Sequence, residues 1–465
     1  MHALECLPNN RQAIHLNDLS VTTLDIDPKE LEATVRTVID EAKRRGATQA
    51  EAAVSVDAGL SVAVRLGDVE TLEYHSDRGL GVTVYFDQRK GSASSADLSR
   101  EALVQTVDKA VSIARYTAED PCAGLAESAL MATTVPDLDL CHPWPLTPDK
   151  AIALALECEQ AARNVDPRIT NSEGAGINSH QGLRVYGNSH GFVGSIPSTN
   201  HSLSCAVVAS DTAGMERDYW YDSARAHDDM VAPSTIGRIA GERTVRRLGA
   251  RKIETVNAPV LFPPELARGL VGHFVAGIRG APQYRKATFL LDSVGQQIFP
   301  DFVNIGERPH LLRAAGSAPM DNEGVATHDR ELVSDGVVQG YVLSSYSARK
   351  LGLQTTGNAG GVHNLLVQPS FSGGLDELAR EMQTGFLVSE LMGQGVNGMT
   401  GDYSRGAAGF WVENGQISYP VHEVTIAGNL RDMFKNIVAI GNDIDTRGRV
   451  RSGSVLLQQM TIAGA

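Results

Sequence analysis

The feature that most constrains the fold is a change in sequence pattern near residue 258. After this point glycine-rich turns separate short apolar runs, and only residues 264–278 and 375–391 have the pattern of helices. Many glycines in a strand-rich region favour curved sheets, bulges and close backbone contacts. The sequence predicts an α+β fold: a loose leader over 1–26, an N-terminal α+β domain over 27–230, a connecting helix and linker over 231–257, and a β-rich C-terminal domain of curved antiparallel sheets over 258–465.

The N-terminal part contains capped amphipathic helices followed by strand-like segments. Asp27-Pro28 and Thr147-Pro148 each combine an N-cap residue with a proline in the first turn, and Ser99 caps a further helix. Short strands are expected near 52–56, 60–66, 69–74 and 80–86, and again near 183–186, 192–193 and 203–209. The outline Tyr, Ser, Gly occurs at 74–79 and at 186–191, which indicates an internal duplication.

Composition excludes several classes of protein. A formal net charge of −14 argues against direct binding of nucleic acid, which requires a concentrated positive face. No apolar run approaches the roughly 18 residues of a membrane span, and the first residues lack the pattern of a signal peptide. The five cysteines, at 6, 122, 141, 158 and 205, contain no Cys-x-x-Cys pair and are expected to be free thiols. We therefore expect a cytoplasmic protein.

Motifs of independent catalysis are weak. Residues 187–191 match the Gly-x-Ser-x-Gly nucleophile elbow around Ser189, but the following residues cannot form the required helix, so a hairpin turn is predicted. The thirteen histidines include no pair at the i, i+4 spacing of a helical zinc site. His273, in the middle of a predicted helix, is expected to be a packed histidine.

Residues 401–430 form the most distinctive segment. Asn414-Gly415 between two apolar-rich runs predicts a β-hairpin, preceded by a polar loop that contains Tyr403, Ser404 and Arg405. Together with 320–327, 341–352, 356–361 and 440–443, this segment resembles the PmbA (TldE) branch of the TldD/PmbA metallopeptidase family. The likeness is strong over 258–465 and rests on element order over 28–230.

The resemblance implies a degenerate metal site. The TldD branch has a His-Glu-x-x-x-His zinc motif on a helix and a downstream cysteine ligand. The matching positions here are Gly272, His273 and Gly277, and no cysteine follows residue 205. A catalytic zinc site needs three protein ligands. We therefore expect no metal, cofactor or catalytic residue in this chain, and zinc in a TldD-type partner.

The function implied is a TldE-like, non-catalytic subunit that contributes assembly and peptide binding to a peptidase acting on small or unfolded peptides. Its expected partners are a TldD-type homologous subunit, bound mainly through the C-terminal domain, and the peptide; alone it is expected to form a homodimer. The loop of Tyr403, Ser404 and Arg405 is either solvated or faces the partner or the peptide. Two alternatives stay open: an autonomous hydrolase that uses Ser189, Ser344 or Ser345, and a gyrase-modulating interaction protein.

Overall fold

The computed structural model describes residues 27–212 and 214–464, so the predicted leader over 1–26 lies outside the described residues. The helices are α1 (Pro28–Arg44), α2 (Arg100–Tyr116), α3 (Pro148–Arg163), α4 (Pro233–Arg246), α5 (Pro264–Ile278), α6 (Gly280–Tyr284), α7 (Ser345–Leu351), α8 (Leu375–Met382) and α9 (Leu430–Lys435). The strands of the N-terminal half are β1 (Gln49–Arg65), β2 (Asp68–Phe86), β3 (Arg89–Ser95), β4 (Ile169–Asn188), β5 (Val193–Ser210) and β6 (Met215–Ala224). Those of the C-terminal half are β7 (Val256–Phe262), β8 (Ile305–Glu307), β9 (Arg330–Ser334), β10 (Val337–Val338), β11 (Leu365–Val367), β12 (Gly385–Met392), β13 (Asp402–Glu413), β14 (Gln416–Asn429), β15 (Ile437–Ile440), β16 (Val450–Arg451) and β17 (Val455–Ala463).

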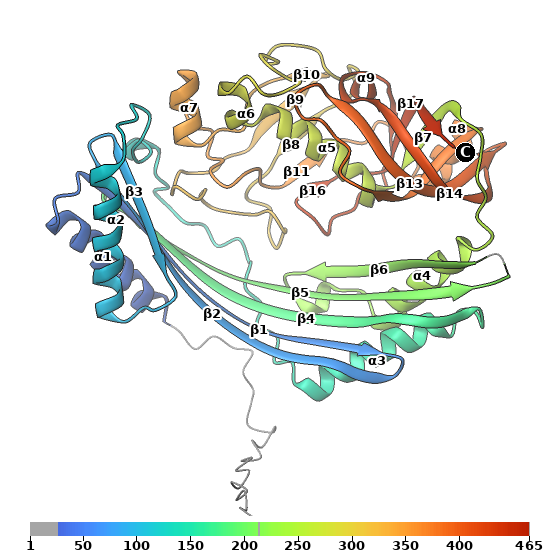
Figure 1. Cartoon of the computed structure of the whole chain (residues 1–465), viewed down its shortest axis with the longest axis horizontal. Coiled ribbons are helices and arrows are strands. Elements are labelled where there is room, and N and C mark those ends of the chain that lie inside the picture. Colours follow the sequence, from blue (N-terminus) through green and yellow to red (C-terminus); the bar gives the residue numbers. More distant parts are fainter. Residues whose placement is uncertain (1–26, 213, 465) are drawn as a thin grey trace, which may run out of the picture.

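The N-terminal half is one antiparallel sheet with helices on a single face. Its strand order is β3-β2-β1-β4-β5-β6, and its long strands curve beneath the C-terminal half (Figure 1). Along β1, Val54 and Val56 join the core beneath α1 and α2, whereas Leu60 and Val62 join the core beneath α3 and α4. Residues at alternate positions, such as Glu51 and Asp57, lie on the opposite face. That face is therefore polar and turned toward the C-terminal half.

The predicted internal duplication is present, but the residues that suggested it do not correspond. A helix, three strands and a second helix occur twice: α1, β1–β3, α2 and then α3, β4–β6, α4. The first strands of the two units, β1 and β4, pair antiparallel at the centre of the sheet. Tyr74 lies on β2, the second strand of its unit, whereas Tyr186 lies on β4, the first strand of its unit.

The C-terminal half contains two sheets, which confirms the α+β class. One has the order β14-β13-β12-β7-β17-β15, and a further pairing between β14 and β17 closes five of its strands into a ring. The other consists of short strands in the order β10-β9-β8-β11-β16. The pairs β12–β7 and β11–β16 are parallel, so the sheets are mixed where antiparallel pairing was expected throughout.

The predicted hairpin over 401–430 is confirmed. β13 and β14 pair from Asp402 with Asn429 to Glu413 with Gln416. Asn414 and Gly415 both have positive φ, 53° and 72°, as a type I′ turn requires.

Three local predictions are wrong. The helix expected over 375–391 ends at Met382 as α8, and the chain then forms β12, because Gln383 adopts a positive φ that terminates the helix. The short strands expected in the N-terminal half merge into strands of 17 to 20 residues. Residues 403–405 are not a loop, as described below.

The segment 231–257, expected as a connector, contains α4, which packs on α3 and on β5 and β6. The predicted domain bounds themselves stay a prediction. Among the described residues, no helix has both the length and the apolar character that crossing a bilayer requires.

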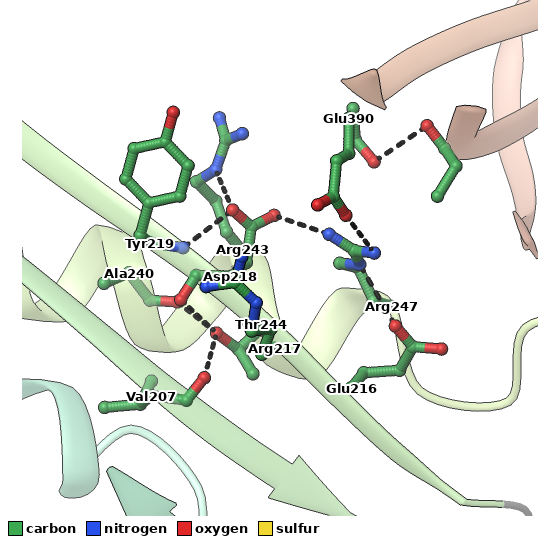
Figure 2. Close-up of polar contacts among 12 residues, drawn as sticks. Val207, Glu216, Arg217, Asp218, Tyr219, Ala240, Arg243, Thr244, Arg247 and Glu390 are labelled. Carbon is green, nitrogen blue, oxygen red and sulfur yellow. Dashed lines mark hydrogen bonds and ion pairs between the residues drawn. The ribbon is translucent and has the colours of Figure 1, made fainter. Parts of the chain in front are cut away.

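A buried ionic network joins α4 and β6 to the C-terminal half (Figure 2). The guanidinium of Arg247 lies 3.2 Å from Glu216, 3.7 Å from Asp218 and 2.7 Å from Glu390 on β12. One turn earlier, Arg243 contacts Asp218 and, at 2.8 Å, Glu265 at the start of α5. These contacts fix β12 and α5 relative to the curved sheet.

Candidate functional site

Helix α5 carries the positions that the resemblance aligns with the zinc motif, residues 272, 273 and 277. It begins at Pro264 and buries an apolar face that includes Leu270, Phe274 and Ile278. Residues 268, 272 and 276 follow one another at intervals of four and therefore share the opposite face. The Arg268 guanidinium donates to the Tyr221 hydroxyl on β6 at 3.0 Å. The first residue of this face, Arg268, therefore contacts the N-terminal sheet.

The two glycines of the motif differ in their surroundings. A Cβ at Gly272 would meet open space. A Cβ at Gly277 would lie 2.8 Å from Leu290 Cδ1, closer than real Cβ atoms lie to a neighbour, and 3.2 Å from the Phe289 ring, which is tighter than most such contacts. The backbone carbonyl of Gly277 also accepts hydrogen bonds from Gln283 and Thr288, both at 2.8 Å. Residue 277 therefore packs against the 283–290 segment, and an imidazole would not fit there without repacking.

His273 is half-buried and faces β13. Its ring lies edge-on to the Tyr403 ring, with centroids 5.9 Å apart. Burial lowers the pKa of His273, and the nearby charge of Arg405 lowers it further. The imidazole is therefore neutral at physiological pH, and a neutral imidazole nitrogen can bind a metal ion.

Residues 403–405 belong to β13 and do not form the expected polar loop. Tyr403 is buried, and burial raises the pKa of its phenol to about 12. Arg405, two residues further along the same strand face, donates to the Leu391 carbonyl at 3.4 Å, while its buried Nε has no partner among the described residues. The Ser404 amide donates to the carbonyl of Gly395, in the loop that precedes β13, at 2.7 Å. The pairing of β13 with β14 orders this segment.

The donor set at this position does not fit zinc. His273 is the one imidazole of the aligned motif, and its ring neighbours are a phenol and a guanidinium. Within residues 27–212 and 214–464, no group of three or more His, Cys, Asp and Glu side chains is arranged to hold a metal ion. Zinc prefers sulfur, imidazole and carboxylate ligands, so we derive no catalytic step through a metal at this position.

The three candidate nucleophiles lie in structural positions. Ser189 Oγ accepts the Ala50 amide at 3.1 Å, within the turn that follows β4. Ser344 is the N-cap of α7. Ser345 Oγ donates to Glu323 Oε2 at 2.5 Å, and the same carboxylate oxygen accepts the Ser345 amide at 2.9 Å. Glu323 thus fixes the start of α7.

Sequence reasoning missed a hollow of about 440 Å³ between the polar face of the N-terminal sheet and the 322–323 loop. In this hollow the Glu51 carboxylate accepts the hydroxyls of Tyr85 at 3.1 Å and Tyr186 at 2.9 Å. Burial raises the pKa of Glu51, and the negative charge of Glu323 raises it further. A cationic or hydrogen-bond-donating group would relieve the repulsion between these two carboxylates. The sequence signal that could have indicated this hollow is Glu51, an acidic residue on the polar side of a strand in which apolar and polar residues alternate.

Comparisons with known sequences cover most of the chain. Sequence models of the PmbA/TldA metallopeptidase match in three parts: domain 1 at residues 50–114, the central domain at 141–248 and the C-terminal domain at 255–464. The metalloprotease PmbA of Escherichia coli O157:H7 is 52% identical over 446 residues, which span 96% of this chain and 98% of that protein.

Relatives from one organism separate the two branches. The PmbA homolog of Haemophilus influenzae is 48% identical over 96% of this chain and 98% of its own length. The TldD homolog of the same organism is 22% identical over 92% of both chains. Among solved structures, a putative modulator of DNA gyrase from Bacteroides thetaiotaomicron has a TM-score of 0.89 and 29% identity, covering 94% of this chain and 99% of that one.

Proposed function

The chain belongs to the PmbA branch of the PmbA/TldD metallopeptidase family, and from this membership we propose that it is the metal-free subunit of a two-component peptidase. In this proposal a TldD-type homologous subunit holds the zinc and hydrolyses small or unfolded peptides. This chain contributes the assembly surface and part of the peptide-binding groove. The proposal also places the complex in the cytoplasm.

One observation carries the proposal: the position of the zinc motif lacks ligands although its helix is intact. At Gly277 the problem is one of space as well as chemistry, since Leu290 and Phe289 occupy the volume that a side chain would need. A helix that keeps its packing while lacking the ligands is expected where shape serves an assembly.

The surface near this position supports the assembly role. Met392 at the end of β12 and Met399 in the following loop are 43% and 63% exposed. The two methionines lie on either side of Val396 in the sequence, which pairs with Tyr403 of β13. The Tyr403 ring in turn contacts the His273 ring. Exposed methionines adapt to partner surfaces and are common at binding sites. We propose that the TldD-type subunit covers this surface, and that a homodimer covers it when the partner is absent.

The first experiment measures zinc and activity of the chain alone. The purified chain is treated with excess zinc, dialysed and examined by elemental analysis, and cleavage of an unfolded peptide is followed in parallel. We expect less than stoichiometric zinc and no cleavage. Stoichiometric zinc that disappears in a His273→Ala variant would overturn the proposal.

The autonomous hydrolase is the second candidate, because Ser345 contacts a carboxylate that could serve as a base. Ser345 is only 2% exposed, however. The Glu323 oxygen that accepts its hydroxyl also accepts the Ser345 backbone amide, which is the kind of contact that stabilises the start of a helix. Chelator-resistant cleavage by the chain alone, abolished in Ser345→Ala, would favour this candidate. A gyrase-modulating role rests on the description of the Bacteroides relative, and a gyrase complex without any effect on peptide cleavage would favour it.

A further inference from the structure

A second hollow, of about 320 Å³, lies beside the Glu51 hollow and contains three arginines. One wall is the polar face of the N-terminal sheet, which provides Arg184 on β4 and Arg225 after β6. The other wall consists of the 315–322 and 359–363 segments together with Arg449. Residues from both halves of the chain thus form one cavity.

Among the described residues, the hydrogen-bond acceptors of the three guanidiniums are neutral oxygens. Arg184 donates to the side-chain oxygen of Asn322. Arg225 donates to the carbonyls of Thr199 at 2.8 Å and Ala315 at 3.1 Å, and its buried Nε has no partner in the part of the chain that the structure describes. Arg449 has a long contact, 3.4 Å, with the Val362 carbonyl. Other arginines at the junction of the two halves, such as Arg247 in Figure 2, contact carboxylates directly.

The hollow contains three guanidiniums and one acidic side chain, Asp321. Burial lowers the pKa of Arg184, and the charge of Asp321 partly opposes this. Burial also lowers the pKa of Arg225, and the charge of Arg449 lowers it further. Guanidiniums nevertheless stay protonated in proteins. Asp321 is the acidic residue of the lining, and its oxygens already accept the amides of Glu323, Val325 and Ala359. Burial raises the pKa of Asp321 to about 7, which weakens its contribution of negative charge.

We propose that this arginine hollow binds the C-terminal carboxylate of a peptide. Guanidinium groups bind carboxylates through paired, charge-assisted hydrogen bonds, and partial burial strengthens such bonds. The hollow, of about 320 Å³, is large enough to hold one terminal residue of a peptide. This inference rests on the proposed peptide-binding role and specifies which end of the peptide the chain recognises.

The neighbouring hollow gives the bound peptide a direction. Asn322 lines both hollows, so the arginine hollow and the Glu51 hollow adjoin. On β4, Arg184 and Tyr186 occupy alternate positions on the same face, and such residues lie about 7 Å apart. The peptide then runs from its C-terminal carboxylate at the arginines toward the carboxylates of Glu51 and Glu323. An inorganic anion would satisfy the arginines without using this second hollow.

The test uses the complete chain and an N-terminally dansylated trialanine with either a free C-terminal carboxylate or a C-terminal amide. Fluorescence anisotropy measures the binding of each probe, and inorganic phosphate serves as a competitor. Variants are Arg184→Gln, Arg449→Gln and, as the matched control, Arg78→Gln. Arg78 is an exposed arginine of the same sheet, on β2, outside the hollow. Arg225 stays unchanged because it bridges both halves.

The free acid is expected to bind at least about tenfold more tightly than the amide, because the amide lacks the charge that the arginines recognise. Arg184→Gln and Arg449→Gln should each reduce this preference about tenfold or more, and Arg78→Gln should leave it unchanged. Equal binding of acid and amide would overturn the proposal. Binding of phosphate that depends on Arg184, without any preference for the free acid, would also overturn it and assign the hollow to a free anion. Because the assay needs no partner, failure of partner-dependent cleavage would refute the proposed function and leave this result in place.

Discussion

Replacement of Arg247 by methionine should destabilise the chain strongly. The arginine side chain is 10% exposed and lies within 4 Å of Glu216, Asp218 and Glu390. Methionine fills much of the same volume but leaves these carboxylates without their shared cation. Arg243 still contacts Asp218, so one of the three keeps a positive neighbour.

The magnitude follows from this geometry. Removal of one partner from a buried ion pair costs about 3–5 kcal/mol, and the remaining contact of Asp218 with Arg243 argues for the lower end, about 3 kcal/mol. The matched control is Arg238→Met, at an exposed position of α4. Arg238 contacts Glu242 at 2.7 Å, but their side chains are 54% and 49% exposed. Exposed pairs at this spacing contribute about 0.5 kcal/mol or less.

The assay is urea unfolding followed by far-UV circular dichroism, with limited proteolysis as a second readout. If the two halves unfold in separate transitions, the urea midpoint of each transition is compared between variants, because a single free energy of unfolding is then not defined. Because Glu390 belongs to the C-terminal half, Arg247→Met should also speed cleavage in the 247–255 connection. A Glu390→Gln variant should lose part of the same stabilisation, and the double variant should cost less than the sum. Equal effects of Arg247→Met and Arg238→Met would refute the assignment of the network as the link between the halves.

Three further predictions concern packing, protonation and assembly. Gly277→Ala should lower the free energy of unfolding by about 1–2 kcal/mol because its Cβ meets Leu290, whereas Gly272→Ala should raise it by up to about 1 kcal/mol; urea unfolding that gives both the same sign would contradict this. The buried carboxyl of Asp321 has a pKa raised to about 7, above about 4 in the unfolded chain, so the folded state binds the proton more tightly and stability falls as the pH rises through this window. Asp321→Asn should remove this component of the pH profile, and an identical slope in both proteins would be evidence against it. Met399→Glu should reduce co-purification with a TldD-type subunit at least about tenfold, while Ile113→Glu on α2 should not; equal recovery of the two would place the interface elsewhere.

The helices of the N-terminal half were predictable because their signals are local. Asp27, Ser99 and Thr147 each accept a backbone amide at the start of a helix, as the capping pattern predicts. Ser234 has a side chain typical of an N-cap, but Ala232 is the N-cap of α4 and Pro233 occupies its first turn. Proline with its fixed φ therefore begins this helix two positions earlier than an N-cap at Ser234 would place it.

The long strands were not predictable from local pattern. Residues 75–79 are polar and mostly exposed, yet they continue β2 because β1 pairs with them along its length. Tyr403 was assigned to a loop because small polar residues surround it, whereas pairing with β14 orders the segment and buries the ring. Tertiary pairing thus outweighed composition in both segments.

The candidate site shows the same division between local and tertiary information. Gly272 and Gly277 could be named from the sequence once the motif was aligned, and the absence of zinc at these positions stays a prediction. Arg184, Arg225 and Arg449 are far apart in the sequence and belong to no motif. Only the closure of the C-terminal half over the curved sheet brings them to one hollow.

The most direct test of the account is a titration of a fixed amount of zinc-loaded TldD-type subunit with this chain. Cleavage of an unfolded peptide is the readout, and a TldD-type subunit with its motif glutamate replaced is the control. The account predicts that activity rises with added chain and saturates at an equimolar ratio, and that the control stays inactive at every ratio. Full activity of the TldD-type subunit before addition, or activity of the mixture with the inactive control, would contradict the claim that this chain is a metal-free, non-catalytic subunit.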